Sequence, residues 1–198
     1  MAKKSDQGLT RMKATHKFAE DKYETLRDSA RNLAATTLPR IMSNGKGQAI
    51  SLRESVRLAG IDLHTRLKAK SWDDSPFRQV TWDWSDLVSD YVRLHPKRFE
   101  LAVWYRDLFL CGLSIGRPTW SDNKLRLDFI EASPEETPLT GLITDITIAA
   151  AEAYADVIGV VQLRIMNPIN DKVRAHYLAK GRGFTYDRRG NYCFKDLA

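Results

Sequence analysis

Apolar residues recur along this chain with two periods, and each period predicts one kind of element. Between residues 15 and 37 they fall three and four positions apart, which predicts an amphipathic helix that ends before Pro39. The same spacing predicts helices over residues 84–99, 137–158 and 170–180. Short apolar or alternating runs between turn residues predict strands over residues 77–84, 100–105, 108–116, 124–132, 160–166, 184–186 and 192–194.

Capping residues support the two helices nearest the carboxyl end. Thr137, with a proline directly after it, can cap the first helix, and Asn170 can cap the second. Gly159 and Gly181 follow these helices at positions where glycine commonly ends a helix. These signals predict a strand, helix and strand over residues 160–186.

The order of the elements favours a mixed α+β fold. From Phe77 onward it reads strand, helix, three strands, helix, strand, helix and two strands, and the three consecutive strands suit an antiparallel meander. We therefore expect a central, mostly antiparallel sheet flanked by helices over residues 71–198. Residues 1–70 are expected to form a mostly helical amino-terminal extension, and its polar, aperiodic start, residues 1–13, is predicted to be disordered.

Residues 51–70 have the outline of a helix-turn-helix. Ser51 with Glu54 three residues later suits a helix start, Gly60 interrupts the helix, and a second helix can follow from Leu63. That second helix would present polar side chains to DNA, namely His64, Thr65, Arg66 and Lys68. A helix hairpin that packs on the neighbouring domain has the same pattern, so both interpretations stay open.

Charge is distributed unevenly along the chain. Residues 1–70 hold 15 Lys and Arg against 7 Asp and Glu, whereas residues 71–198 hold 16 against 18. A basic region attracts anionic partners, so we expect contact with nucleic acid or an acidic protein through residues 1–70. A solvated basic face that keeps the protein soluble is the alternative.

Several classes of protein are not expected. The first residues contain no apolar run of a secretory signal, and the most apolar stretch, residues 139–161, is interrupted by acidic residues, so we expect neither secretion nor a membrane span. The 2 cysteines and 4 histidines have no metal-ligand spacing, so no metal site is expected. Together these features predict a cytoplasmic protein.

One motif adds to what the periodicity predicts. Asn170, Val173 and Tyr177 are followed by Gly-Phe at 183–184, within the element order given above. This unit resembles the GCN5-related N-acetyltransferase (GNAT) superfamily, whose motif reads N-x-x-A-x-x-x-Y and then G-F, and the resemblance covers residues 77–198. Here Val173 replaces the alanine, and two additional residues separate Tyr177 from the Gly-Phe pair.

The resemblance implies an enzyme that transfers an acetyl group from acetyl-CoA, or an acyl group from another acyl-CoA, to an amine. The strand at 124–132 would bulge and separate from the strand at 160–166, which would open a cleft. The pantetheine arm of the cofactor would pair with backbone groups near Ile130, Glu131 and Ala132.

The resemblance also assigns roles to side chains. Tyr177 would protonate the departing thiolate, Asn170 would help hold the cofactor arm, and Glu131, or else Asp128, would take the proton from the amine. Without the resemblance, Tyr177 four residues after Val173 equally fits a half-buried core residue. The histidine before Tyr177 is expected on the surface.

The pyrophosphate would rest on backbone N–H groups at the start of the helix after the cleft, around Thr140, Gly141 and Leu142. The loop of the superfamily reads Q/R-x-x-G-x-G/A, and matching Gly141 to its first glycine puts Pro138 at the Q/R position. Proline has no N–H to donate, and two glutamates shortly before it would repel phosphate. The loop is therefore degenerate.

Two functions remain open. The first is a GNAT-type N-acyltransferase that acts on an amine of a large or anionic acceptor, such as a charged tRNA, a nucleic-acid base or an acidic protein. The second is a catalytically inactive protein of the same fold, which binds DNA or another protein through residues 1–70.

Overall fold

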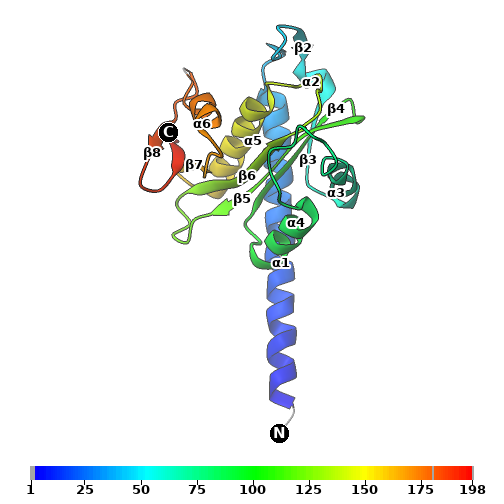
Figure 1. Cartoon of the computed structure of the whole chain (residues 1–198). Helices are drawn as coiled ribbons and strands as arrows, with labels where there is room; N and C mark the ends of the chain where they lie inside the picture. The colour runs from blue at the N-terminus through cyan, green and yellow to red at the C-terminus, as the bar shows by residue number, and fades with distance from the viewer. Residues whose placement is uncertain (1–2, 180, 198) are drawn as a thin grey trace.

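The computed structural model describes residues 3–179 and 181–197, with side chains from residue 15 onward. The helices are α1 (Lys3–Thr37), α2 (Leu52–Ser55), α3 (Leu63–Lys70), α4 (Trp84–Leu94), α5 (Ile143–Ile158) and α6 (Asp171–Tyr177). The strands are β1 (Ile41–Ser43), β2 (Ala49–Ser51), β3 (Val56–Ala59), β4 (Phe99–Tyr105), β5 (Phe109–Pro118), β6 (Leu125–Ala132), β7 (Gln162–Met166), β8 (Thr185–Asp187) and β9 (Tyr192–Asp196). The amino-terminal part of α1 extends beyond the sheet (Figure 1).

Seven strands form one sheet in the order β3-β4-β5-β6-β7-β9-β8, and β1 pairs with β2 in a separate hairpin. Neighbouring strands of the sheet are antiparallel except for β6 and β7, which run parallel. The predicted mixed α+β fold, with a mostly antiparallel sheet flanked by helices, is confirmed.

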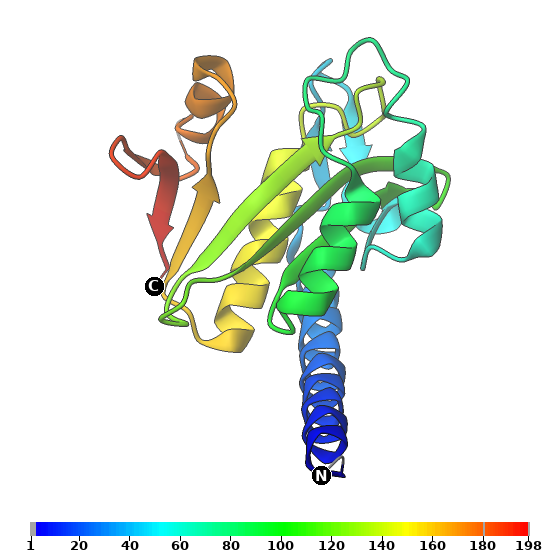
Figure 2. The same ribbon diagram turned by 60° about the horizontal axis from the view of Figure 1, so that its bottom comes forward.

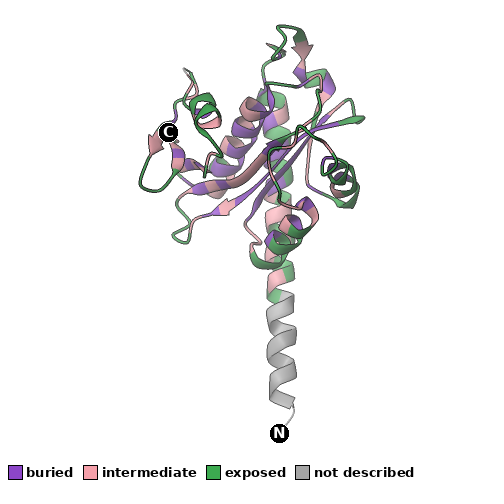
Figure 3. Cartoon of the chain, in the orientation of Figure 1, coloured by how far each residue is buried: buried purple, intermediate pink, exposed green. Residues whose placement is uncertain are grey.

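Helices cover both faces of the sheet (Figures 1 and 2). On one face, α1 and α5 enclose the larger core, in which Ile146, Ala150 and Tyr154 of α5 are at most 1% exposed. On the other face, α3 and α4 enclose a smaller core around Trp104 and Tyr91. Figure 3 shows buried positions concentrated in α5 and the central strands. The sheet therefore separates two cores, each with its own pair of helices.

The helix α1 contributes side chains to the core of the sheet. The predicted boundary at residues 70–71 is therefore not a boundary of the fold. Ala30 and Ala34 of α1 are buried in the same core as α5. Arg27 of α1, 1% exposed, donates hydrogen bonds to two glutamates of α1 and, at 2.8 Å, to the Pro96 carbonyl before β4. A buried guanidinium needs such partners, and they fix α1 against the sheet.

The helix α1 also starts earlier than the periodicity predicts. It begins at Lys3, so it includes most of the stretch 1–13 that is predicted to be disordered, while residues 1 and 2 lie outside the described part of the chain. Among the described residues, no helix combines the length and the apolar character that crossing a bilayer requires.

The prediction of a helix-turn-helix at residues 51–70 is wrong. After the single turn of α2 the chain extends into β3, which pairs antiparallel with β4. Val56 and Leu58 pack on the core and Arg57 is exposed, an alternation typical of a strand at the edge of a sheet. Only the second predicted helix is confirmed, as α3, with Asp62 as its N-cap.

The predicted strand at residues 77–84 is also wrong. Before α4 begins at Trp84, this segment has no regular secondary structure. Its position is set by side chains, because Arg78, Trp82 and Trp84 all donate hydrogen bonds to the Glu131 carboxylate of β6. The aromatic residues that suggested a strand therefore serve long-range contacts.

The helix predicted from Thr137 begins later, at Ile143. Gly141 has a left-handed backbone with φ of 87°, which interrupts any helix through it, and Leu142 takes the N-cap position. The other end is as predicted: Gly159, with φ of 71°, caps α5.

Candidate active site

The strands β6 and β7 separate at their carboxyl ends. They pair only over residues 125–127 of β6 and 163–165 of β7. Beyond this point β6 continues to Ala132, with a bulge at Asp128, which has no partner residue in β5. The predicted bulge and separation of the two strands are confirmed, and a bulge bends a strand in this way.

A cavity of about 720 Å³ lies where the two strands separate. Part of its lining comes from the start of α5, the end of β7 and α6, and we call this part the α6 wall. The remainder comes from residues 77–82, α4 and β6, and we call it the α4 wall. Ile130 and Ala132 of β6, both predicted to lie beside a cofactor, line the cavity.

Tyr177 belongs to the α6 wall and is 7% exposed. Its phenol ring packs in the larger core, and within the described residues its hydroxyl group makes no hydrogen bond. Burial raises the pKa of Tyr177 to about 12. The hydroxyl therefore keeps its proton at neutral pH and remains free to donate it to a group in the cavity.

Asn170 caps α6, as predicted. Its Oδ1 atom accepts a hydrogen bond from the Val173 N–H at 2.9 Å. The Asn170 amide nitrogen donates no hydrogen bond within the described residues, and Asn170 lines the cavity. Its side chain can therefore cap the helix and donate to a ligand at the same time. The helix ends at Tyr177, before the predicted end at Gly181.

His176 is exposed, as predicted, and it also belongs to the α6 wall. Its Nε2 atom lies 3.1 Å from the Thr144 hydroxyl in the first turn of α5. Burial and the nearby Arg182 guanidinium lower the pKa of His176. The helical spacing held a signal, because Val173, His176 and Tyr177 follow an i, i+3, i+4 pattern and so share a face of α6.

The structure places Thr140, Gly141 and Leu142 outside the cavity lining. The tip of the β1–β2 hairpin covers this segment: the Gly45 N–H donates to the Thr140 carbonyl at 2.7 Å. The α5 residues that do line the cavity are Ile143 and the residue after it. The first hydrogen bond of α5 starts at the Ile146 N–H, so the preceding N–H groups of its first turn are free to bind an anion.

Replacing Gly141 by alanine is expected to destabilise the protein by about 1–3 kcal/mol, because alanine would hold a strained backbone there. Its Cβ would also lie 2.9 Å from the Gly45 nitrogen. Gly47 is the matched control, since it has a left-handed backbone with nothing within 4 Å of an added Cβ. Urea unfolding of both alanine variants measures the difference, and equal losses would contradict a role for the hairpin contact.

Glu131 of the α4 wall is 7% exposed and accepts four hydrogen bonds. Arg78 donates from Nε at 2.8 Å and from Nη2 at 3.1 Å, and the indole nitrogens of Trp82 and Trp84 donate at 3.1 and 2.6 Å. These four donors fill the acceptor positions of the carboxylate. This geometry fits an anchor for residues 77–82 better than it fits the proton acceptor that the resemblance implies.

Asp128, the bulged residue, also faces the α4 wall. Its Oδ2 atom accepts a hydrogen bond from the Tyr91 hydroxyl at 2.6 Å, and its Oδ1 atom accepts one from Arg126. Burial and the Asp128 carboxylate raise the pKa of Tyr91. The carboxylate thus lies where β6 leaves β7, at the junction of the two walls.

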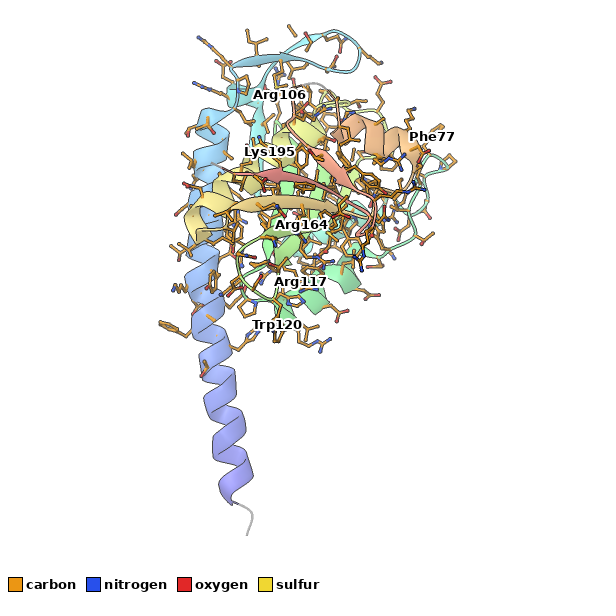
Figure 4. The ribbon with its side chains drawn as sticks, turned by 90° about the vertical axis from the view of Figure 1, so that its left-hand side faces the viewer. Phe77, Arg106, Arg117, Trp120, Arg164 and Lys195 are labelled. Carbon is orange, nitrogen blue, oxygen red and sulfur yellow. The ribbon has the colours of Figure 1, made fainter. Side chains whose placement is uncertain are left out.

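The aromatic side chains of the α4 wall are partly open. Trp82 and Phe129 are half-buried, and their ring centroids lie 5.0 Å apart at an interplanar angle of 72°. Phe77, labelled in Figure 4, also lines the cavity and is 67% exposed. This end of the cavity therefore offers apolar surface to a ligand.

Comparison with known proteins identifies the fold. No family model and no curated protein matches the sequence. Solved structures do match: an acetyltransferase of the GNAT family from Staphylococcus aureus has a TM-score of 0.56 at 9% identity, over 73% of this chain and 100% of that one. A variant of the spermidine N-acetyltransferase SpeG from Vibrio cholerae has a TM-score of 0.53 at 11% identity, over 72% and 94%.

The N-acetyltransferase PseH from Campylobacter jejuni is a third match, with a TM-score of 0.51 at 12% identity, over 72% of this chain and 99% of that one. At such low identity these likenesses describe the fold and not the substrate. The chain therefore has the fold of the GCN5-related N-acetyltransferase superfamily.

Proposed function

We propose that the protein is an N-acyltransferase that moves an acetyl group from acetyl-CoA, or an acyl group from another acyl-CoA, to an amine. One observation carries this proposal: the cavity at the separation of β6 and β7 is lined by Tyr177, whose hydroxyl group makes no hydrogen bond within the described part of the chain. An acyl-CoA supplies the acyl group as an activated thioester. The residues of the cavity would bind it, orient it and handle the protons.

The α6 wall, together with the free edge of β6 opposite it, fits an acyl-CoA at three points. The edge of β6 that faces β7 has no strand partner beyond Leu127, so backbone groups near Ile130 and Ala132 can pair with the amides of a pantetheine arm. The Asn170 amide can donate to the same arm. The free N–H groups in the first turn of α5 can hold a pyrophosphate, with the helix dipole in support.

The degenerate loop is less unfavourable to phosphate than its sequence suggests. Lys46 at the hairpin tip forms an ion pair with Glu136, and the Ser75 hydroxyl donates a hydrogen bond to Glu135 at 2.6 Å. The Lys46 ion pair therefore offsets part of the repulsion that Glu136 would exert. Binding of the phosphates would depend on the first turn of α5 instead of on the degenerate loop.

Tyr177 would donate its phenolic proton to the thiolate sulfur as the sulfur leaves. A free thiol has a pKa of about 8.5, well below that of Tyr177, so the transfer would be unfavourable in water. Burial in the same cavity also raises the pKa of the sulfur, which brings the two groups closer. Asp128 would accept a hydrogen bond from the attacking amine and receive its proton.

The pH dependence of kcat follows from the raised pKa of Tyr177. An acid must be protonated to act, and Tyr177 with a pKa of about 12 is protonated at all lower pH values. The rate is therefore expected to rise as the amine deprotonates and to show no falling limb up to about pH 10.5, whereas an ordinary tyrosine of pKa about 10 would already be losing its proton there. A falling limb with a midpoint below pH 10 would contradict this role.

The direct test is binding and transfer. Calorimetric titration with acetyl-CoA should give saturable binding, and release of free CoA thiol in the presence of amines should give turnover. Dephospho-CoA and CoA itself serve as matched ligands for the phosphate and acyl contacts. Absence of binding at millimolar acetyl-CoA would remove the enzymatic proposal.

The inactive alternative is motivated by the degenerate loop, and its DNA-binding version no longer has a helix-turn-helix to rest on, because residues 56–59 form β3. Part of the excess positive charge of residues 1–70 is also neutralised by ion pairs in the folded protein. Basic residues of the first part pair with acidic residues of the second, as in Lys46 with Glu136, Arg57 with Asp107 and Lys70 with Asp83. Contact of residues 1–70 with an anionic partner stays a proposal, tested by salt-dependent binding to a short duplex DNA.

A further inference from the structure

We propose that the acceptor is a monoamine carried on an apolar, preferably aromatic, body. The body would lie against Trp82 and Phe129 of the α4 wall, and the amine nitrogen would lie against Asp128. This inference rests on the proposed acyl transfer and names the class of molecule that the second half of the cavity would take.

The first argument is the open aromatic surface. Phe129 is in edge contact with Trp82 on one side and with Tyr91 on the other, at centroid distances of 5.0 and 6.4 Å and interplanar angles of 72° and 82°. All three residues line the cavity. Trp82 and Phe129 remain half-buried although they adjoin the smaller core. Concave apolar surface of this kind binds an apolar ligand, and its rings favour a flat one.

The second argument is that the surface is held in place without a ligand. The Trp82 indole nitrogen donates to Glu131 at 3.1 Å, and the Trp82 carbonyl accepts from Arg78 at 2.8 Å. Both ends of this residue are therefore fixed to the buried Glu131–Arg78 ion pair. A ring that is already oriented costs little conformational entropy when a ligand packs on it.

The third argument is charge. Each carboxylate of the α4 wall is paired with a guanidinium, Glu131 with Arg78 and Asp128 with Arg126. A polyamine carries several positive charges and needs several carboxylates with open acceptor positions. Glu131 already accepts four hydrogen bonds, whereas Asp128 accepts from Tyr91 and Arg126 and can accept from one amine in addition. An anionic body would need unpaired guanidinium groups, and these two are engaged. One amine and an apolar body match what remains.

The fourth argument is position. Asp128 lies at the bulge where β6 leaves β7, and it is the side chain of the α4 wall that stands at the junction with the α6 wall. An amine bound to its carboxylate would face the end of the cavity that holds Tyr177. The rings would bind the same molecule through cation–π contact while the amine is still protonated.

The test measures binding of four small probes to the full chain without acyl-CoA, by calorimetry. 2-Phenylethylamine is expected to bind about tenfold more tightly than spermidine or 3-phenylpropionate, and several-fold more tightly than hexylamine, in line with aromatic and cation–π contacts. Equal or tighter binding of spermidine or of 3-phenylpropionate would overturn the inference, and so would binding of none of the four probes.

Variants locate the site. Phe129→Leu keeps an apolar side chain and is expected to abolish the preference for 2-phenylethylamine over hexylamine, and Trp82→Leu provides a second variant if the first does not fold. Trp120→Leu is the matched control, because Trp120 is 101% exposed and lies outside the cavity (Figure 4). An unchanged preference in the folded cavity variant would overturn the inference. Because no acyl-CoA is present, these binding results are independent of whether acyl transfer occurs. Transfer to spermidine but not to 2-phenylethylamine would refute the inference about the acceptor and leave the proposed acyl transfer intact.

Discussion

Replacing Tyr177 by phenylalanine is expected to lower kcat for acyl transfer by about 10²–10⁴-fold, the usual contribution of a general acid. The substitution removes the hydroxyl proton and keeps the ring that packs in the larger core. The affinity for acetyl-CoA should stay the same, since the phenol group would act on the sulfur as it leaves and not on the bound thioester. Single-turnover rates measure this step separately from product release.

The matched control for this variant is Tyr186→Phe. The Tyr186 hydroxyl bonds to Asn191 at 2.9 Å in the β8–β9 hairpin, and Tyr186 does not line the cavity. Loss of the Tyr186 hydroxyl should change kcat by no more than about twofold, because this residue lies away from the reacting groups. If Tyr177→Phe keeps the single-turnover rate of the unchanged protein, Tyr177 is a core residue only, and the proton must come from water.

The sequence predicted best where periodicity and local caps determine the structure. The strands β4, β5 and β6 and the cap at Asn170 follow from patterns within about ten residues. β3 was missed because its four residues are stabilised by pairing with β4, more than forty positions later, while the nearby Ser51 and Glu54 favour a helix locally. Pairing over such a distance overrides local preference.

The sequence predicted the part of the site that is formed by one motif and by the strand before it. Tyr177 and Asn170 lie on the cavity, and so do Ile130 and Ala132, because the helix after β7 and the bulge of β6 bring them together. The role of Glu131 was not predictable in the same way. Its hydrogen-bond donors come from residues 78–84, a segment whose aromatic residues also fit a strand.

Replacing Glu131 by glutamine is expected to destabilise the protein by about 3–5 kcal/mol, the cost of removing one partner of a buried ion pair. The Arg78 side chain is 8% exposed and would lose the buried one of its two charged partners, keeping only Asp73, and the new amide group would direct donors toward the indole N–H groups. Urea unfolding measures this loss. Glu135→Gln is the control, since Glu135 is exposed and also accepts a side-chain hydrogen bond, from Ser75.

The same variant separates an anchor from a catalytic base. As an anchor, Glu131 holds residues 77–82 in place, so its loss should raise KM for the amine and leave the affinity for acetyl-CoA unchanged. A base would instead lower kcat with little change in stability. Adding Arg78→Met removes the guanidinium that has lost its buried partner and should recover part of the lost stability, because a buried pair can be replaced by apolar groups more easily than one partner of it can be removed. A double variant that is no more stable than Glu131→Gln alone would show that the pair does not anchor this wall.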